Sequence, residues 1–308
     1  MTKNSNETAT GTSASVATLD RPAIERIGVV GCGLMGSGIA EVFARAGLDV
    51  MVLEADEAAA ERGRARIEKS LSNAERRGKL SEVDGKAALA NIGFTVDGSE
   101  LADRQLVIEA VNEDEQRKVE TFKMLDKVLA DNPDAILASN TSSIPIMKLA
   151  MATSRPERVI GLHFFNPVPV LALVEVVTSL LTNEETLNTT TELVSKVLNK
   201  KVINSTDRAG FIVNALLIPY LLSAIRMFES GFATAEDIDQ GMIEGCAHPM
   251  GPLALTDLIG LDTTMAVAES LYEEFKEQLY APPPLLCRMV EAGLLGRKAG
   301  RGFYEYVK

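Results

Sequence analysis

Two residues able to move a proton stand twelve positions apart in the middle of this sequence. His163, one of two histidines in the chain, follows the apolar run RVIGL, while Glu175 lies alone in the apolar segment LALVEVV. A carboxylate that is buried in such a segment needs a hydrogen-bond partner, and His163 is the obvious candidate. A carboxylate–imidazole pair keeps one ring nitrogen as N–H and leaves the other free to act as a base. The pair therefore indicates general acid–base chemistry.

A second set of residues has the spacing of a nucleotide-binding loop. Gly31, Gly33 and Gly36 form G-x-G-x-x-G after the apolar run IGVV, and Glu54 lies at the end of the next apolar run. In this context the first glycine permits a tight turn, the second lets the backbone approach a pyrophosphate, and the third allows helix and strand to pack closely. The start of the following helix offers unpaired N–H groups to the phosphates.

The acidic residue after the second strand discriminates between cofactors. The Glu54 carboxylate can accept hydrogen bonds from both hydroxyls of an adenosine ribose, whereas it repels the 2′-phosphate of NADP. The residues that follow, Ala55, Asp56 and Glu57, add negative charge and no arginine. The sequence therefore predicts NAD as the cofactor.

Polar residues at two further places are candidates for substrate contacts. Ser142 belongs to the polar cluster SNTSS, which follows an apolar strand at the place where ligands bind in parallel sheets. The hydroxyl of Ser142, or that of Ser143, either meets a substrate oxygen or caps the next helix. Asn214 is the one amide in FIVNALLIPYLLSAIRMF, so it makes either a helix–helix hydrogen bond or a ligand contact. The apolar pattern of this segment predicts a central helix that is buried nearly all round.

A basic run stands out in an otherwise acidic chain. It covers residues 61–80 and contains Arg62, Arg66, Lys69, Arg76, Arg77 and Lys79. One interpretation is a solvated helix with ion pairs between successive turns. The other is a binding surface for a phosphate-bearing part of the substrate. The sequence leaves both open.

Short apolar runs that alternate with helical segments must position these residues. We expect strands at 27–30, 48–56, 104–110 and 134–140, and two further strands that carry His163 and Glu175. Such alternation predicts an α/β fold with a parallel, Rossmann-type doubly wound sheet and crossover helices.

Bulk properties argue against several classes of protein. The 308 residues suffice for about two domains, and the formal net charge of −12 argues against nucleic acid as a partner. The three scattered cysteines suit neither a metal site nor a disulfide framework, which favours a reducing, cytoplasmic location. Residues 1–23 lack the apolar core of a secretory signal and are predicted to be a disordered tail. The longest apolar stretch, about fifteen residues, is shorter than the roughly 20 that a membrane helix needs.

Longer motifs contain these residues and stand in a fixed order. They are GCGLMGSGIA, EAVNEDEQRK, SNTSS, GLHFFNPVPV, LVEVV, GFIVN, HPMGPLALTDLIGLDT and GRKAGRGFYEY. From about Ile24 onward the chain resembles the L-3-hydroxyacyl-CoA dehydrogenases, including the 3-hydroxybutyryl-CoA dehydrogenases, as a stand-alone enzyme. The resemblance implies an NAD-binding Rossmann-type domain over 24–204. It also implies an all-α C-terminal domain over 205–308, which contributes to the substrate site and forms a homodimer interface.

The resemblance also implies roles for individual residues. His163 and Glu175 would be the catalytic pair, with Ser142 and Asn214 beside them. The implied cofactor-binding residues are Gly31, Gly33, Leu34, Met35, Gly36, Glu54, Glu113, Lys118, Asn140 and Ser142. The implied contacts to the acyl-CoA are Ser70, Arg77, Ser142, Asn166 and Asn214.

The reaction implied is the reversible, NAD-dependent oxidation of an (S)-3-hydroxyacyl-CoA to the 3-oxoacyl-CoA, without a metal ion, nucleic acid or membrane. A related sugar-acid dehydrogenase of the L-gulonate type is one alternative. The paired phenylalanines after His163 and the basic run fit an acyl chain and a CoA group better than a small polyol acid. A catalytically idle NAD-binding protein is the other, and the intact His163–Glu175 pair argues against it. Ala209 and Ala299 depart from the family pattern, and neither touches that pair.

Overall fold

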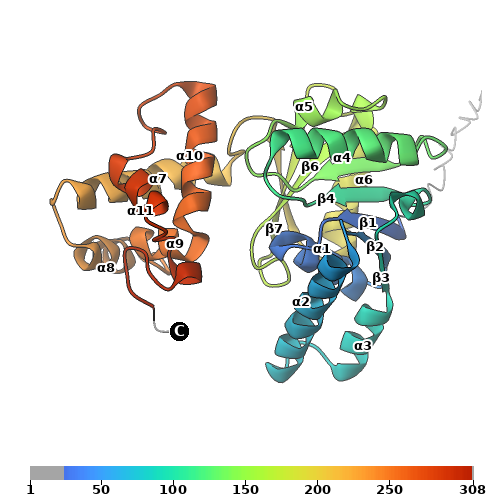
Figure 1. Cartoon of the computed structure of the whole chain (residues 1–308), viewed down its shortest axis with the longest axis horizontal. Coiled ribbons are helices and arrows are strands. Elements are labelled where there is room, and N and C mark those ends of the chain that lie inside the picture. The colour runs from blue at the N-terminus through green and yellow to red at the C-terminus, as the bar shows by residue number, and fades with distance from the viewer. Residues whose placement is uncertain (1–23, 307–308) are drawn as a thin grey trace, which may run out of the picture.

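The structure, a computed structural model, describes residues 24–306, so the tail predicted for residues 1–23 lies outside the described residues. A sheet with helices on both faces lies beside a group of helices formed by the last third of the chain (Figure 1). Among the described residues, none of the helices is long and apolar enough to cross a membrane.

The sheet has eight strands in the order β3-β2-β1-β4-β5-β6-β7-β8. The strands are β1 (Arg26–Val30), β2 (Asp49–Leu53), β3 (Ile92–Thr95), β4 (Leu106–Glu109), β5 (Ile136–Ser139), β6 (Val159–Phe164), β7 (Leu173–Thr178) and β8 (Lys201–Thr206). The first six are parallel and the order reverses between β1 and β4, so the prediction of a Rossmann-type doubly wound sheet is confirmed.

The last two strands depart from the predicted all-parallel sheet. β7 runs antiparallel to β6, and β8 pairs parallel with β7. The connection from β6 to β7, residues 165–172, contains no helix. A parallel crossover needs about a dozen residues or more, so this short connection can only reverse the chain.

Two hydrophobic cores cover the two faces of the sheet. On one face pack α1 (Leu34–Arg45), α2 (Glu57–Arg76), α3 (Glu82–Ala90) and α6 (Glu184–Glu192), the last continued by a π-helical turn at Leu193–Val197. On the other face pack α4 (Glu115–Val128) and α5 (Ile146–Ala150), together with the short 3₁₀ turn at Gly98–Leu101. Helices that pack on both faces leave the carboxyl ends of the parallel strands as the open edge.

The helical part has its own core. It consists of α7 (Val213–Glu229), α8 (Ala235–Cys246), α9 (Pro252–Ile259), α10 (Leu261–Phe275) and α11 (Pro284–Glu291). The expectation that α7 is buried nearly all round is wrong. Ile218, Leu222 and Ile225 face the core, whereas Leu216 is 73% exposed.

Two buried carboxylates attach the last residues of this part to its helices. Asp257 accepts hydrogen bonds from the backbone N–H groups of Phe303 (2.9 Å) and Tyr304 (3.0 Å) and from the Tyr306 hydroxyl (2.9 Å). Asp239 accepts one from the Tyr304 hydroxyl (2.9 Å). Because both carboxylates are almost fully buried, these groups complete their hydrogen bonding.

A third buried carboxylate is poorly satisfied. Glu41 of α1 is 1% exposed, and its Oε2 has no hydrogen-bond partner. Burial raises the pKa of Glu41, and the hydrogen bond from Ser70 and the charge of Arg45 offset this only in part. Because the folded-state pKa is raised, ionisation of Glu41 destabilises the fold as the pH rises above the usual range of the carboxyl group.

We expect Glu41→Gln to raise the free energy of unfolding near neutral pH by about 1 kcal/mol, the lower end of the cost of an unsatisfied buried polar group. The gain should shrink towards about pH 4, where the carboxyl of the native protein is also neutral. Urea unfolding of both proteins across this pH range measures the difference. A constant difference at every pH would contradict this account.

Candidate active site

The glycine loop joins β1 to α1 at the open edge of the sheet. Gly31 has a φ of +88°, a left-handed conformation that favours glycine, and its N–H donates to the carbonyl of Leu53 (2.9 Å). A Cβ on Gly36 would lie 1.8 Å from the carbonyl oxygen of Gly31, so only glycine fits where helix and loop cross. A Cβ on Gly33 would meet no atom within 4 Å, which leaves open space beside this backbone.

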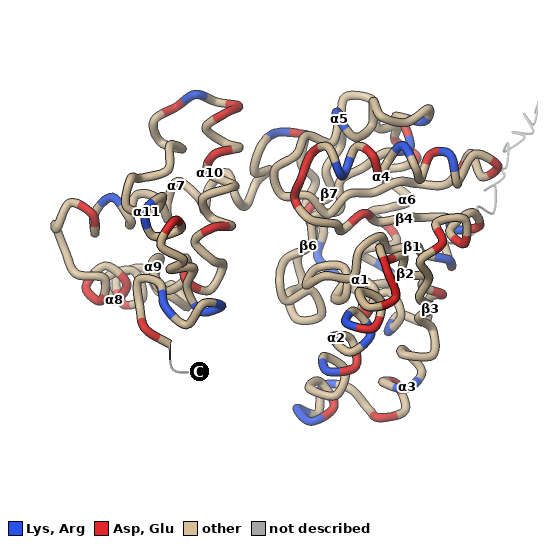
Figure 2. Tube along the Cα trace, viewed as in Figure 1, with Lys and Arg blue, Asp and Glu red and all other residues tan. Residues whose placement is uncertain are grey.

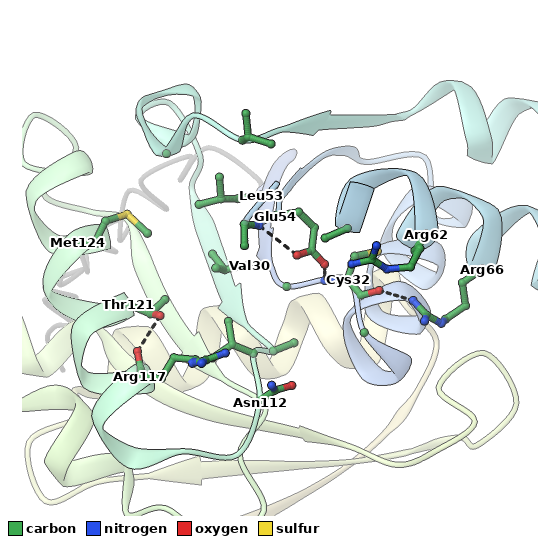
Figure 3. A pocket seen from close by; sticks show the side chains of 18 residues that line it. Val30, Cys32, Leu53, Glu54, Arg62, Arg66, Asn112, Arg117, Thr121 and Met124 are labelled. Atoms are coloured by element: carbon green, nitrogen blue, oxygen red, sulfur yellow. Dashed lines mark hydrogen bonds between the residues drawn. The ribbon is translucent and has the colours of Figure 1, made fainter. Parts of the chain in front are cut away.

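A pocket of about 800 Å³ opens beside the loop (Figure 3). Three of the predicted cofactor-binding residues, Gly31, Gly33 and Glu54, line it. Three others lie nearby without lining it, since Leu34 and Met35 start α1 and Gly36 is buried beneath the loop. The pocket spans the carboxyl ends of β1 and β2 and residues after β4, which is where a doubly wound sheet binds one half of a dinucleotide.

Charged side chains hold the backbone of Cys32 in this loop from both sides. Glu54 accepts a hydrogen bond from the Cys32 N–H, and the Arg66 guanidinium donates to the Cys32 carbonyl (2.7 Å; Figure 3). Burial, and then the charge of Glu54, raise the pKa of the Cys32 thiol to about 12. The two hydrogen bonds to the Cys32 backbone thus hold the loop against Glu54 on one side and α2 on the other.

Arg62 and Arg66 line the same pocket as Glu54, a position that was not predicted for them (Figure 3). The signal was available, because residues four apart on a helix share a face, and Ala59 of that face also lines the pocket. Lys and Arg recur along the rest of α2, with acidic residues between them (Figure 2). The basic run is thus divided. Arg62 and Arg66 line the pocket, whereas its later residues, Lys69, Arg76, Arg77 and Lys79, do not.

His163 and Glu175 lie directly opposite each other on β6 and β7. The His163 Nδ1 and the Glu175 Oε2 are 2.6 Å apart, and the two residues are 6% and 0% exposed. Since a carboxylate only accepts, Nδ1 carries the proton of this hydrogen bond. No hydrogen bond of the described residues involves Nε2, which is therefore the ring nitrogen available to a ligand.

The second oxygen of Glu175 binds the helical part of the chain. Its Oε1 accepts hydrogen bonds from the backbone N–H groups of Ile212 (3.1 Å) and Val213 (2.9 Å), at the start of α7. The rings of Phe165 and Phe211 lie 4.5 and 5.4 Å from the His163 ring, measured between centroids. The imidazole is thus held from one side by a carboxylate and packed against aromatic rings.

The loop after β5 carries Asn140 and Ser142. Asn140 Oδ1 accepts a hydrogen bond from the Phe164 N–H (2.9 Å), which ties this loop to the residue after His163. The Ser142 N–H donates to Glu113 (3.0 Å), a residue of the loop after β4. The structure thus brings together Ser142, Glu113 and Asn140 at the carboxyl ends of neighbouring strands.

Glu113 is held as a charged group. Burial acts to raise its pKa, but the Lys118 ammonium and hydrogen bonds from Thr141, Ser143 and Ser142 outweigh burial and lower it. Lys118, 3.3 Å from Glu113, is itself 1% exposed and also bonds Glu109. Glu109 was not predicted as a site residue, although it is a carboxylate at the end of an apolar strand, the same signal that singled out Glu54.

The other predicted substrate residues are less closely gathered. Asn214 is partly exposed at the start of α7, so the expectation of a buried amide is wrong, and none of the hydrogen bonds among the described residues involves its side chain. Asn166 is exposed on the connection after β6. The Ser70 side chain bonds Glu41, and Arg77 is exposed at the end of α2.

Comparison with known proteins gives two domain matches in succession. The NAD binding domain of 3-hydroxyacyl-CoA dehydrogenase matches residues 26–208, and the C-terminal domain of 3-hydroxyacyl-CoA dehydrogenase matches residues 210–306. The first match confirms the prediction of NAD as the cofactor.

Individual relatives agree with these matches. A 3-hydroxybutyryl-CoA dehydrogenase of Mycobacterium tuberculosis is 61% identical, over 92% of this chain and 99% of its own length. The human mitochondrial hydroxyacyl-coenzyme A dehydrogenase is 38% identical over 99% of both chains. The crystal structure of FadB2 from M. tuberculosis has a TM-score of 0.91 at 61% identity, covering 92% of this chain and 100% of the other. With both domains matched and relatives of such identity, the chain belongs to the 3-hydroxyacyl-CoA dehydrogenases, a family of NAD-dependent oxidoreductases.

Proposed function

We propose that this protein oxidises (S)-3-hydroxyacyl-CoA thioesters, 3-hydroxybutyryl-CoA among them, to 3-oxoacyl-CoA, and catalyses the reverse reduction. The observation that carries the proposal is the buried His163–Glu175 pair, at the same edge of the sheet as the glycine loop. A bound NAD, held along the glycine loop, would supply the acceptor for the hydride that leaves C3 of the substrate. Reduction of acetoacetyl-CoA by NADH, with a sugar acid such as L-gulonate as the comparison substrate in the oxidative direction, tests it directly.

His163 is the general base in this proposal. A secondary alcohol cannot lose hydride from carbon unless its hydroxyl proton also leaves, so a base within about 3 Å of that oxygen is required. The Nε2 of His163 is the available ring nitrogen, because Nδ1 is engaged with Glu175. Imidazole suits the task, because one ring nitrogen can accept a proton while the other keeps its hydrogen bond to a carboxylate.

Glu175 orients the base and stabilises the imidazolium that forms. Its 2.6 Å contact fixes which ring nitrogen carries the proton, and the hydrogen bonds from α7 hold its other oxygen. Ser142 and Asn214 then orient the substrate oxygens, with Asn166 close to the acyl group. Such positioning replaces a random encounter with a fixed geometry.

The remaining assignments concern the cofactor and the CoA group. NAD would lie along Gly31, Gly33, Leu34, Met35 and Gly36, with Glu54 on the adenosine ribose. Its reactive half would approach Glu113, Lys118, Asn140 and Ser142. Ser70 and Arg77 would contact the CoA group, for which the exposed end of α2 offers positive charge.

We further propose that the protein is a cytoplasmic homodimer. The chain divides into a cofactor-binding part, residues 24–204, and a helical part, residues 205–308, which forms a homodimer. The exposed Leu216 and Met227 on α7 and Phe232 after it support an apolar contact between copies. A cytoplasmic location is supported by the three free cysteines, which suit a reducing compartment.

The cofactor assignment predicts a strong preference for NADH over NADPH. Glu54→Ser should weaken NADH binding by roughly tenfold, by loss of the ribose contacts. NADPH binding should improve, because Arg62 and Arg66 then face the 2′-phosphate without an opposing carboxylate. Fluorescence titration of both cofactors measures the two constants. A native protein that prefers NADPH would contradict the role of Glu54.

His163→Gln should lower kcat by about 10²–10⁴-fold, the range expected for loss of a general base. NADH binding should remain near native, because the pocket is lined by other residues. Glu175→Gln should also be impaired, and the double variant should lose much less than the two losses combined, since the pair acts as a unit. Turnover of the His163 variant within a few-fold of native would make the histidine a core residue.

Arg77→Ala should raise KM for acetoacetyl-CoA with little change in kcat, the pattern for a contact shared by ground and transition states. Lys79→Ala, which removes a neighbouring exposed charge of the same sign, is the matched control. Equal KM values for the native protein and the Arg77 variant would support the interpretation of this region as a solvated surface.

A further inference from the structure

A buried carboxylate that none of the roles above uses lies at the end of β4. The Oε1 of Glu109 accepts hydrogen bonds from Lys118 Nζ (2.7 Å) and from the Val111 N–H (2.7 Å), while Oε2 accepts one from the Ser139 hydroxyl (2.6 Å). Glu109, Lys118 and Ser139 are at most 1% exposed. Burying an ammonium and a carboxylate together is costly unless further hydrogen bonds satisfy both. Such a pair in this position calls for an explanation beyond stability.

The contacts of Glu109 extend to both loops of the site. Through Lys118 they reach Glu113, whose Oε2 lies 3.3 Å from Nζ and whose Oε1 accepts hydrogen bonds from the loop after β5. Through Ser139 they reach that loop directly, since the Ser139 hydroxyl also accepts the Thr141 N–H (3.2 Å). One buried carboxylate thus fixes the loop after β4 against the loop after β5.

The position of this group in the sheet relates it to the cofactor. Glu54 lies at the β2 end of the pocket, and the pocket extends from there to residues after β4, so the other half of a dinucleotide continues over the carboxyl ends of β4 and β5. Glu109 and Ser139 are the last residues of these two strands, paired in register. His163 follows at the end of β6, the next strand.

We propose that Glu109 is a positioning residue, which holds Lys118 and Glu113 so that the three present a net negative charge to the reactive half of NAD. Two carboxylates and one ammonium sum to −1. The nicotinamide ring is cationic when oxidised and neutral when reduced, so this charge favours binding of the oxidised form. The inference rests on the proposed function for the direction in which the dinucleotide lies.

Glu109→Gln is the decisive variant, because it removes one charge and keeps the size of the side chain. Lys118 retains Glu113 as its partner, and the charges of the group then sum to zero. We expect the Kd for NAD to rise about tenfold, as for a unit charge about 10 Å away at an effective dielectric constant of about 20. The Kd for NADH should change less than about threefold. Calorimetry for NAD and fluorescence for NADH, both without acyl-CoA, give the two constants.

Two control variants separate charge from structure. Ser139→Ala removes a hydrogen bond of the same carboxylate without changing its charge. Asp126→Asn disturbs another partly buried ion pair, with Arg155 at 3.0 Å, that takes no part in the site. Both should keep the native ratio of the two dissociation constants. A merely structural Glu109 would weaken NAD and NADH equally, and an unchanged ratio in Glu109→Gln overturns the proposal.

Glu109→Asp keeps the charge but shortens its reach, and it serves where the glutamine variant does not fold. It should keep the native ratio of dissociation constants and lose about tenfold in kcat through displaced loops, within the range seen when positioning is lost. Native kcat in this variant overturns the positioning role. Turnover of acetoacetyl-CoA by the native protein is measured first. Its failure counts against the proposed function, whereas native turnover with an unchanged ratio in Glu109→Gln counts against Glu109 alone.

Discussion

The carboxylate of Glu175 connects the two parts of this molecule. One oxygen holds the imidazole of His163, and the other accepts the first N–H groups of α7, where the helical part begins. A fully buried carboxylate is tolerated only when its hydrogen bonds are complete, so the position of α7 and the orientation of the imidazole depend on each other. A displacement of α7 therefore also displaces the carboxylate that holds the imidazole of His163. The sheet alone could not hold the site.

The elements that could be predicted from sequence are those with local signals. The alternation of β1, β2, β4 and β5 with helices, the glycine loop, Glu54 and the His163–Glu175 pair all have the spacing that their chemistry requires. The strands β3 and β8 escaped prediction because IGFT and KVINST are short and alternate weakly. The antiparallel direction of β7 follows from the short connection at 165–172. The apolar pattern of a strand predicts the strand itself and not its direction.

Part of the site could not be predicted, for a different physical reason. Glu109 at the end of an apolar strand and the shared helix face of Arg62 and Arg66 can be seen in the sequence. Their partners, Lys118 for Glu109 and the Cys32 carbonyl for Arg66, lie on other elements, so the contacts themselves depend on how those elements pack. Asn214 shows the reverse error. An apolar sequence around an amide predicted burial, but a helix buried on one face only leaves it partly exposed. The composition of a segment indicates how much of it can be buried, but the packing of the fold determines which face of the helix is buried.

The attachment of residues 296–306 to Asp257 and Asp239 has a consequence during synthesis. All strands of the sheet have emerged from the ribosome with Thr206, and the last partners of Glu175 follow with Ile212 and Val213, so the cofactor-binding part can fold while most of the helical part is still being made. The helical part cannot do the same. Until Phe303, Tyr304 and Tyr306 emerge, Asp257 lacks the partners that its burial demands, and Asp239 has only the N–H groups of Leu253 and Ala254. During translation the cofactor-binding part can therefore fold first, and the active site is complete only after the helical part has folded.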